Sequence, residues 1–214
     1  MAIQFQVFTV TELQENCYVV WDDATSDAVV IDPGGEAEMI ARFLRDRNLS
    51  PHLILNTHGH VDHIGGNAAL RTMTGAPIGI HPLDAPMLSS RMLCGADWLG
   101  WEFEEHQPDF MLAEGQPVEA GSLRFEVTHT PVHSPGSVSL YLKDEGLLFS
   151  GDLVFLNGVG RWDLPGGDPV ALFHSIREKF LTLPDDTQVF PGHGPNTTVG
   201  YERRTNPYFG ESVE

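Results

Sequence analysis

Residues 57–63 read THGHVDH, which places four side chains that bind metals, His58, His60, Asp62 and His63, in one short stretch. His58 and His60 are two positions apart, so in an extended segment they project to the same side. Asp62 and His63 are adjacent and should begin a turn, since two glycines and a helix-like pattern follow. Four ligands around one small cation would demand a very tight loop. Two ions sharing the segment strain it less, and two ions need more ligands than this loop supplies.

Three further segments carry the remaining candidates, each where an apolar strand gives way to a loop. HTPVHSPG contains His129 and His133, SGDLVF contains Asp152, and PGHGP contains His193. Taken singly, an isolated histidine is usually structural, and an aspartate after a glycine usually caps a turn. Their shared position at strand ends, where loops held by a rigid sheet collect catalytic groups, indicates a common site instead.

Strand-like and helix-like patterns alternate in both halves of the chain. In the first half, IQFQV, CYVVW, DAVVID, HLILN and PIGI predict strands, and EAEMIARFLRDRN and GGNAALRTMTG predict helices. In the second half, SLRFEVTHTP, SVSLYL, GLLFSGD and TQVFPGHGP predict strands, and PVALFHSIREKFLTL predicts a helix. Because no low-complexity linker separates the halves, a single domain is predicted over residues 1–214.

Residues 81–112 give few periodic signals and contain two of the tryptophans, Trp98 and Trp101. Two interpretations of this segment stay open. It is either an ordinary helix and loop packed by its aromatic side chains, or a lid over a substrate.

Composition excludes several classes of partner. The formal net charge of -18 argues against nucleic-acid binding through a basic surface and against docking on anionic membranes. No apolar run approaches the length of a membrane span, and the N-terminal residues lack the pattern of a signal peptide. Cys17 and Cys94 form no CxxC pair, so reduced thiols and a cytoplasmic location are predicted.

The four metal-type segments, in their order along the chain, resemble the successive metal motifs of the metallo-β-lactamase-fold hydrolases. VVIDPGG resembles the early Asp-bearing turn of that family, and GVGRWDLPGGD and TTVGYERRTNPYF are most similar to its short bacterial members, which are themselves similar to glyoxalase II. The resemblance implies a mixed α/β, four-layer αββα sandwich with a binuclear site, usually zinc, along one edge of the β-sandwich. It also implies thioester cleavage of the hydroxyacylglutathione hydrolase type.

Carried over by position, the resemblance assigns a role to each motif residue. His58, His60 and His133 would hold the first ion, Asp62, His63 and His193 would hold the second, and Asp152 would bridge both. The two ions are expected to be Zn²⁺, with iron or manganese as alternatives. His129 is then structural or an outer partner of the site, and Asp32 either orients a ligand or caps a turn.

The implied reaction is hydrolysis of a small-molecule thioester by a hydroxide shared between the metals, with Asp62 and Asp152 as the catalytic carboxylates. No serine or cysteine nucleophile is required. Arg161, Arg203 and Arg204 are candidates for contacting an acidic substrate.

The chain departs from the family pattern in two places. Val132 stands where the family usually has glycine, directly before His133, and valine is strained there if that position needs a positive φ. The chain also ends soon after His193, without the separate C-terminal helical domain that binds glutathione in full-length glyoxalase II. The thiol carrier of the substrate therefore stays open.

Three alternative functions stay open as well. Persulfide dioxygenases share HxHxDH and a GRxD segment but use one iron, which His58, His133 and Asp152 would hold here. A hydrolase of lactones or other esters is possible on the same fold. The third alternative is a non-catalytic metal- or partner-binding module.

Overall fold

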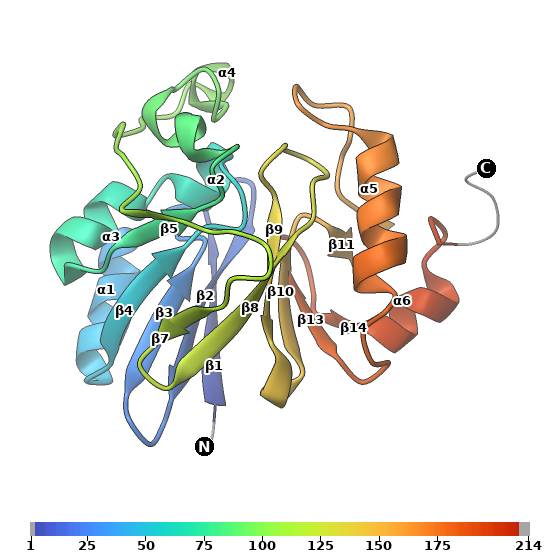
Figure 1. Ribbon diagram of the computed structural model, residues 1–214. Helices are drawn as coiled ribbons and strands as arrows, with labels where there is room; N and C mark the ends of the chain where they lie inside the picture. Colours follow the sequence, from blue (N-terminus) through green and yellow to red (C-terminus); the bar gives the residue numbers. More distant parts are fainter. Residues whose placement is uncertain (1–2, 210–214) are drawn as a thin grey trace.

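The computed structural model describes residues 3–209, which form two six-stranded sheets packed face to face with helices on both outer faces (Figure 1). The strand orders are β1-β2-β3-β4-β5-β6 and β14-β13-β10-β9-β8-β7, with β11 and β12 as a separate pair. The predicted αββα sandwich is thereby confirmed. Residues 1–2 and 210–214 of the predicted domain lie outside the described residues.

Nearly all the predicted elements are present. The first sheet contains β1 (Ile3–Val10), β2 (Glu15–Asp22), β3 (Asp27–Ile31), β4 (Ser50–Leu55), β5 (Ile78–Ile80) and β6 (Phe110–Met111). The second sheet contains β7 (Val118–Ala120), β8 (Leu123–His129), β9 (Val138–Leu142), β10 (Leu147–Gly151), β13 (Gln188–Pro191) and β14 (Thr197–Thr198), and the separate pair is β11 (Val154–Phe155) and β12 (Gly158–Val159).

The helices are short, and most of them connect strands. They are α1 (Ala37–Asp46), α2 (Val61–Ile64), α3 (Asn67–Thr74), α4 (Ala96–Leu99), α5 (Pro169–Ser175) and α6 (Val199–Thr205). Short 3₁₀ helices occupy Ala85–Ser89 and Lys143–Glu145, and a π-helical turn at Ile176–Phe180 continues α5. No helix within residues 3–209 combines the length and the apolar character that crossing a bilayer requires.

Strand direction brings the metal-type motifs to one edge of the sandwich. β3, β4, β5 and β6 run parallel, as do β10 and β13. Parallel neighbours end at the same edge of a sheet, where ligands of α/β proteins usually bind. The His58 loop follows β4, Asp152 follows β10, and His193 follows β13. The order of the elements therefore collects residues that are far apart in the sequence.

The core consists of three apolar layers. The central layer lies between the sheets and joins Ile31 and Leu55 of the first sheet to Phe125, Phe149 and Phe190 of the second. The outer layers pack the opposite faces of the sheets under α1 and α3 on one side and under α5 and α6 on the other (Figure 1). Because β2 and β10 are buried on both faces, their sequences contain the continuous apolar runs CYVVW and LLF.

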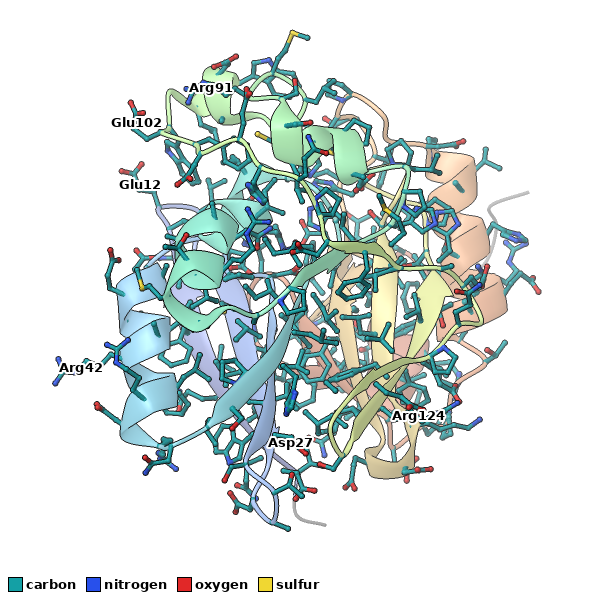
Figure 2. All side chains as sticks on the ribbon, turned by 60° about the vertical axis from the view of Figure 1, so that its left-hand side comes forward. Glu12, Asp27, Arg42, Arg91, Glu102 and Arg124 are labelled. Atoms are coloured by element: carbon teal, nitrogen blue, oxygen red, sulfur yellow. The ribbon has the colours of Figure 1, made fainter. Side chains whose placement is uncertain are left out.

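Between β5 and β6 the chain forms an irregular segment that rises above the metal-type edge and contains α4 (Figure 1). Arg91 fixes this segment, because its guanidinium donates to Asp97 Oδ1 at 2.9 Å and to the Trp101 carbonyl at 2.9 Å. Figure 2 shows Arg91 at this end of the molecule and Asp27 at the opposite end. Trp101 packs against the core, whereas Trp98 is exposed, so the two tryptophans of residues 81–112 have different environments.

Candidate metal centre

The loop after β4 and the start of α2 divide the THGHVDH motif in two. His60 is extended, with φ -73° and ψ 147°, and α2 begins at the next residue. His60 therefore lies on extended backbone and His58 in the bend after β4, whereas Asp62 and His63 lie in the first helical turn, as the sequence predicted for those two residues. The change of backbone direction lets one short motif face two neighbouring points in space.

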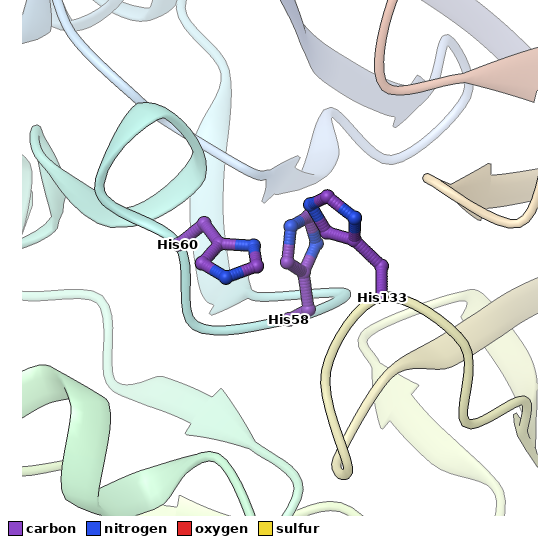
Figure 3. A group of neighbouring side chains, drawn as sticks. All are labelled: His58, His60 and His133. Carbon is purple, nitrogen blue, oxygen red and sulfur yellow. The ribbon is translucent and has the colours of Figure 1, made fainter. Parts of the chain in front are cut away.

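The first group of side chains comprises His58, His60 and His133, whose ligand atoms all lie within 4.8 Å of one another. Their rings converge from two loops (Figure 3). The ring centroids of His60 and His133 are 4.4 Å apart, and those of His58 and His60 are 4.9 Å apart. This is the spacing expected of imidazoles around a common cation.

A second group lies beside the first and comprises Asp62, His63 and His193, again with ligand atoms within 4.8 Å of one another. Asp152 lies between the two groups. Its Oδ1 is 3.5 Å from His63 Nε2, and its Oδ2 is 3.5 Å from His133 Nε2 and 3.9 Å from His193 Nε2. All seven predicted side chains are thus brought together at one edge of the sandwich.

Hydrogen bonds on the far side of three imidazoles orient the rings. In each case Nδ1 donates to an oxygen, which leaves the Nε2 lone pair directed at the site. The pairs are His63 with Asp32 Oδ2 at 3.0 Å, His133 with the Arg161 carbonyl at 3.0 Å, and His193 with the Leu13 carbonyl at 3.1 Å. When these imidazoles are neutral, the protein therefore holds them in the tautomer that a metal requires.

Several buried polar atoms of the two groups have no hydrogen-bond partner among the described residues. They are His58 Nε2, His60 Nδ1, His63 Nε2 and Asp152 Oδ1. A buried polar atom without a partner is unfavourable by roughly 1–3 kcal/mol, so four such atoms converging on one place need an explanation. Divalent cations supply it, because imidazole nitrogens and carboxylate oxygens are ligands for zinc, iron and manganese. The residues fit a binuclear metal site.

Burial and nearby charges set the protonation states of these imidazoles. Burial lowers the pKa of His58 well below its ordinary value and lowers that of His60 to about 3, so both imidazoles are neutral at physiological pH. Burial opposes protonation of His63, but the nearby carboxylates of Asp152, Asp62 and Asp32 prevail and raise its pKa to about 9. Binding of a cation at His63 must therefore release a proton.

Gly192 allows the backbone to lie directly against the site. A Cβ atom at this position would be 2.3 Å from Asp152 Oδ1 and 2.6 Å from His63 Cε1. Both distances are shorter than any tolerable contact, and both partners belong to the two groups. Glycine before His193 is therefore required by close approach.

Asp84 is a buried residue of the site region that the sequence did not identify. Its Oδ2 accepts from the Gly59 amide at 3.0 Å and from Ser134 Oγ at 2.5 Å, and its Oδ1 accepts from the Gly136 amide at 2.7 Å. Gly59 lies between His58 and His60, and Ser134 follows His133. One carboxylate thus ties together the two loops that carry the first group. A single aspartate in an aperiodic segment gives no signal for this role.

Glu15, at the start of β2, was also missed. The side chain is fully buried, neither carboxylate oxygen has a hydrogen-bond partner in the part of the chain that the structure describes, and Oε1 is 3.7 Å from His63 Nδ1. Burial and the nearby charges of Asp32, Asp62 and Asp152 raise its pKa well above the ordinary value. Four buried acidic groups in one place suit the positive charge of two divalent cations.

The remaining sequence interpretations have clear outcomes. Asp32 orients His63 and also accepts from the Thr57 amide at 2.7 Å, so it does more than cap a turn. His129 forms no hydrogen bond with the described ligand atoms of the site. Its Nε2 is 2.8 Å from the Pro135 carbonyl, and its ring stacks on that of His81 with the centroids 4.2 Å apart. Val132 is buried and is absent from the residues with positive φ in the range 3–209, so the expected strain does not arise.

The two groups form the floor of a cleft of about 410 Å³. Arg161 lines this cleft, and its guanidinium is held by Asp163 through two hydrogen bonds of 2.9 Å. Arg203 and Arg204 do not line it, since both pair with Asp185 and Arg203 also donates to two carbonyls at the end of the π-helical turn and beyond. Among the three predicted arginines, the structure brings one to the cleft.

Comparison with known proteins agrees with this geometry. A family model described as the metallo-beta-lactamase superfamily matches residues 10–193. The probable metallo-hydrolase YqgX of Bacillus subtilis is 39% identical over 92% of each chain. Hydroxyacylglutathione hydrolase GloC of Haemophilus influenzae is 35% identical over 96% of this chain and 98% of its own. Mitochondrial persulfide dioxygenase ETHE1 of Mus musculus is 32% identical over 92% of this chain and 72% of its own.

Solved structures show the same similarity. The B3 metallo-beta-lactamase BLEG-1 has a TM-score of 0.93 and 40% identity, covering 97% of this chain and 100% of its own. TTHA1623 in a di-iron-bound form has a TM-score of 0.85 and 43% identity, covering 95% of this chain and 99% of its own. With the family model spanning most of its length and a side-chain cluster suited to two metal ions, the chain belongs to the metallo-β-lactamase superfamily of metal-dependent hydrolases.

Proposed function

We propose that the chain is a binuclear hydrolase of small-molecule thioesters, with both sheets acting as one domain. In this proposal His58, His60 and His133 hold one ion, Asp62, His63 and His193 hold the other, and Asp152 contacts both. The observation that carries the proposal is the convergence of buried, unpartnered ligand atoms from both groups on one floor. A mononuclear site would leave the second group of carboxylate and imidazoles unexplained.

Two bound divalent cations supply Lewis acidity, which lowers the pKa of a water molecule and polarises a carbonyl oxygen. The side chains supply the rest. Burial raises the pKa of Asp62, but His63 and His193 outweigh it and hold that pKa below its ordinary value. Asp62 is therefore ionised at neutral pH and can accept a hydrogen bond from water at the floor.

The choice of a thioester rests on the similarity to GloC, a hydroxyacylglutathione hydrolase, over nearly the whole of both chains. We propose zinc as the metal, and the di-iron form of TTHA1623 makes iron the first alternative to test. The competing proposal is a mononuclear iron dioxygenase, which the similarity to ETHE1 raises.

One experiment separates these proposals. Protein purified without added metal is analysed for metal content and assayed with S-lactoylglutathione, with uncharged thioesters and, for sulfite release, with a persulfide. Two metal ions per chain with thioester turnover support the hydrolase. One iron per chain with sulfite release and no thioester turnover would overturn it.

A further inference from the structure

The cleft above the floor has walls of a different chemistry from the floor itself. Five large apolar side chains face it, namely Leu13, Trp98, Leu99, Phe155 and Leu164. They come from four segments: the β1–β2 loop, α4, β11 and the loop before α5. Figure 1 shows α4 and the loop before α5 projecting beyond the same edge of the sandwich. Residues so distant in sequence form a continuous apolar wall only because the fold gathers them around the site.

Three of these wall residues are unusually exposed for large apolar groups. Trp98 is 58% exposed, Leu13 is 45% exposed and Leu99 is 44% exposed. A single exposed leucine needs no explanation, but apolar side chains that converge around a polar floor mark a binding surface. Contact with an apolar ligand would remove their surface from water, which is favourable.

The wall offers little to an anionic ligand. Arg161 is the one arginine or lysine among the described lining residues, and its Nε and Nη2 donate to the two carboxylate oxygens of Asp163. The other predicted cations, Arg203 and Arg204, are paired away from the cleft. The whole chain carries a net charge of -18, so its long-range field repels anions. Among the described lining residues, a thiol carrier with free carboxylates meets no arginine or lysine that lacks a carboxylate partner.

We propose that the cleft takes thioesters with an uncharged, apolar body, and that Trp98 and Leu13 select them. This inference rests on the proposed hydrolase function. The carbonyl lies at the floor and the apolar body lies along the wall. Hydrolysis adds water across the acyl carbon–sulfur bond: the C–O bond forms, the C–S bond breaks, and the products are a carboxylic acid and a thiol, without oxidation.

The first test uses the metal-loaded full chain and a series of N-acetylcysteamine thioesters with acetyl, butanoyl, hexanoyl and succinyl groups. We expect kcat/KM to rise from acetyl to hexanoyl and to be lowest for the anionic succinyl probe. Trp98→Ala and Leu13→Ala should each raise KM for the hexanoyl probe on the order of 10-fold with little change in kcat. Both variants should therefore show a smaller rise in kcat/KM from the acetyl to the hexanoyl probe. Met92→Ala is the matched control, because Met92 is 60% exposed on the same segment but does not line the cleft.

The second test measures binding without catalysis. S-hexyl-N-acetylcysteamine, a thioether that cannot be hydrolysed, is titrated into metal-free protein, with tryptophan fluorescence and calorimetry as readouts. We expect saturable binding that Leu13→Ala weakens and Met92→Ala leaves unchanged. A carboxylate-bearing thioether of equal length should bind more weakly.

The outcomes distinguish the two proposals. Turnover of S-lactoylglutathione or succinyl thioester that equals or exceeds turnover of the hexanoyl probe overturns the inference and leaves the hydrolase standing. Binding of the hexyl thioether with no turnover of any thioester by metal-loaded protein overturns the hydrolase and supports an apolar ligand. If Met92→Ala lost as much selectivity as Trp98→Ala, the proposal that the apolar wall selects the substrate would also be contradicted.

Discussion

The floor and the wall of the cleft are built in opposite ways. On the floor, His58 and His63 are buried, and hydrogen bonds fix these two imidazoles on the side away from the site. On the wall, Trp98 and Leu13 are exposed and stand on loops. The floor gathers charge and donor atoms, whereas the wall consists largely of hydrocarbon. The molecule therefore separates the part that sets the chemistry from the part that can change with the substrate.

This difference decides where substitutions should act. A change on the floor disturbs several interlocked partners at once, because neighbouring groups in one network are not energetically independent. A change on the wall removes contact area from the ligand and little else. Changes remote from both regions should alter stability alone. The four predictions below test the floor and a region remote from it, beginning with the largest expected effect.

Asp152→Ala should abolish most metal binding and thioester turnover. Asp152 is the carboxylate nearest to both groups, and its loss leaves their imidazoles without a shared partner. We expect activity to fall by more than the roughly 10–100-fold that loss of an outer hydrogen-bonding partner causes. Metal content by mass spectrometry and kcat/KM are the measurements. Asp46→Ala, at an exposed position of α1, is the control, and full turnover by the demetallated Asp152→Ala protein would refute the assignment.

Gly192→Ala should damage the floor without removing any polar atom. The new methyl group would overlap Asp152 Oδ1 and His63 Cε1, so either the backbone or those side chains must move. Overpacking of this kind costs about 1–3 kcal/mol, and we expect metal affinity to fall toward the upper end of a roughly 10–100-fold range. Calorimetric metal titration and thermal unfolding measure both effects. Gly158→Ala is the control, since its Cβ would meet only an ordinary contact at 3.7 Å; equal behaviour of the two variants would contradict the close-approach argument.

Asp84→Asn should weaken the first group selectively. The side-chain amide of asparagine accepts only at its oxygen. Either the Gly59 amide and the Ser134 hydroxyl, or the Gly136 amide, would therefore face an NH₂ group. We expect metal affinity to fall about 10-fold, with kcat lowered more than KM. Asp97→Asn, on the same segment but paired with Arg91 near the surface, should leave metal affinity unchanged. An unchanged affinity in Asp84→Asn would show that the loops hold without it.

The smallest effect is expected at Asp27, at the end of the molecule remote from the cleft (Figure 2). Hydrogen bonds with the Thr25 hydroxyl, the Ser122 amide and His52 lower the pKa of Asp27 from 3.8 to about 2. A depressed pKa means that this carboxylate stabilises the fold above pH 3.8 and that the contribution disappears as pH falls toward 2. Urea unfolding of wild type and Asp27→Asn should therefore differ slightly at pH 5 and converge near pH 2. A difference in unfolding free energy that stays constant with pH would argue against linkage to this carboxyl. Thioester turnover at neutral pH should be the same in both proteins.

The sequence predicted the fold correctly, and the structure brings the seven motif residues together, whereas their metal-binding roles stay a prediction. The alternating strands and the change from extended to helical backbone at THGHVDH are local patterns that the packing reinforces, as β4 and α2 show. The motif residues share one chemistry and one position, at strand ends, so their convergence followed from parallel strand order. His58, His133 and His193 belong to this class.

What the sequence did not reveal depends on distances across the fold. Asp84 and Glu15 are single acidic residues whose roles exist only because other loops approach them. Trp98 and Leu13 share a wall although a large part of the first sheet separates them along the chain. Arg203 illustrates the opposite error. The sequence made it a candidate for contacting the substrate, but its guanidinium donates to two backbone carbonyls away from the cleft. Such side-chain pairings carry no local signal.

The start of β2 has a consequence for the order of folding. Asn16 donates to the carbonyls of Pro191 and Gly194, and the Tyr18 hydroxyl donates to that of Pro191. The loop that carries His193 is thus hydrogen-bonded to a strand that precedes it by 173 to 178 residues. Contacts of such long sequence separation form slowly, because the intervening chain must first be ordered. A growing polypeptide would expose THGHVDH long before the His193 loop is made, so the protein should become able to retain metal only after that loop has joined β2.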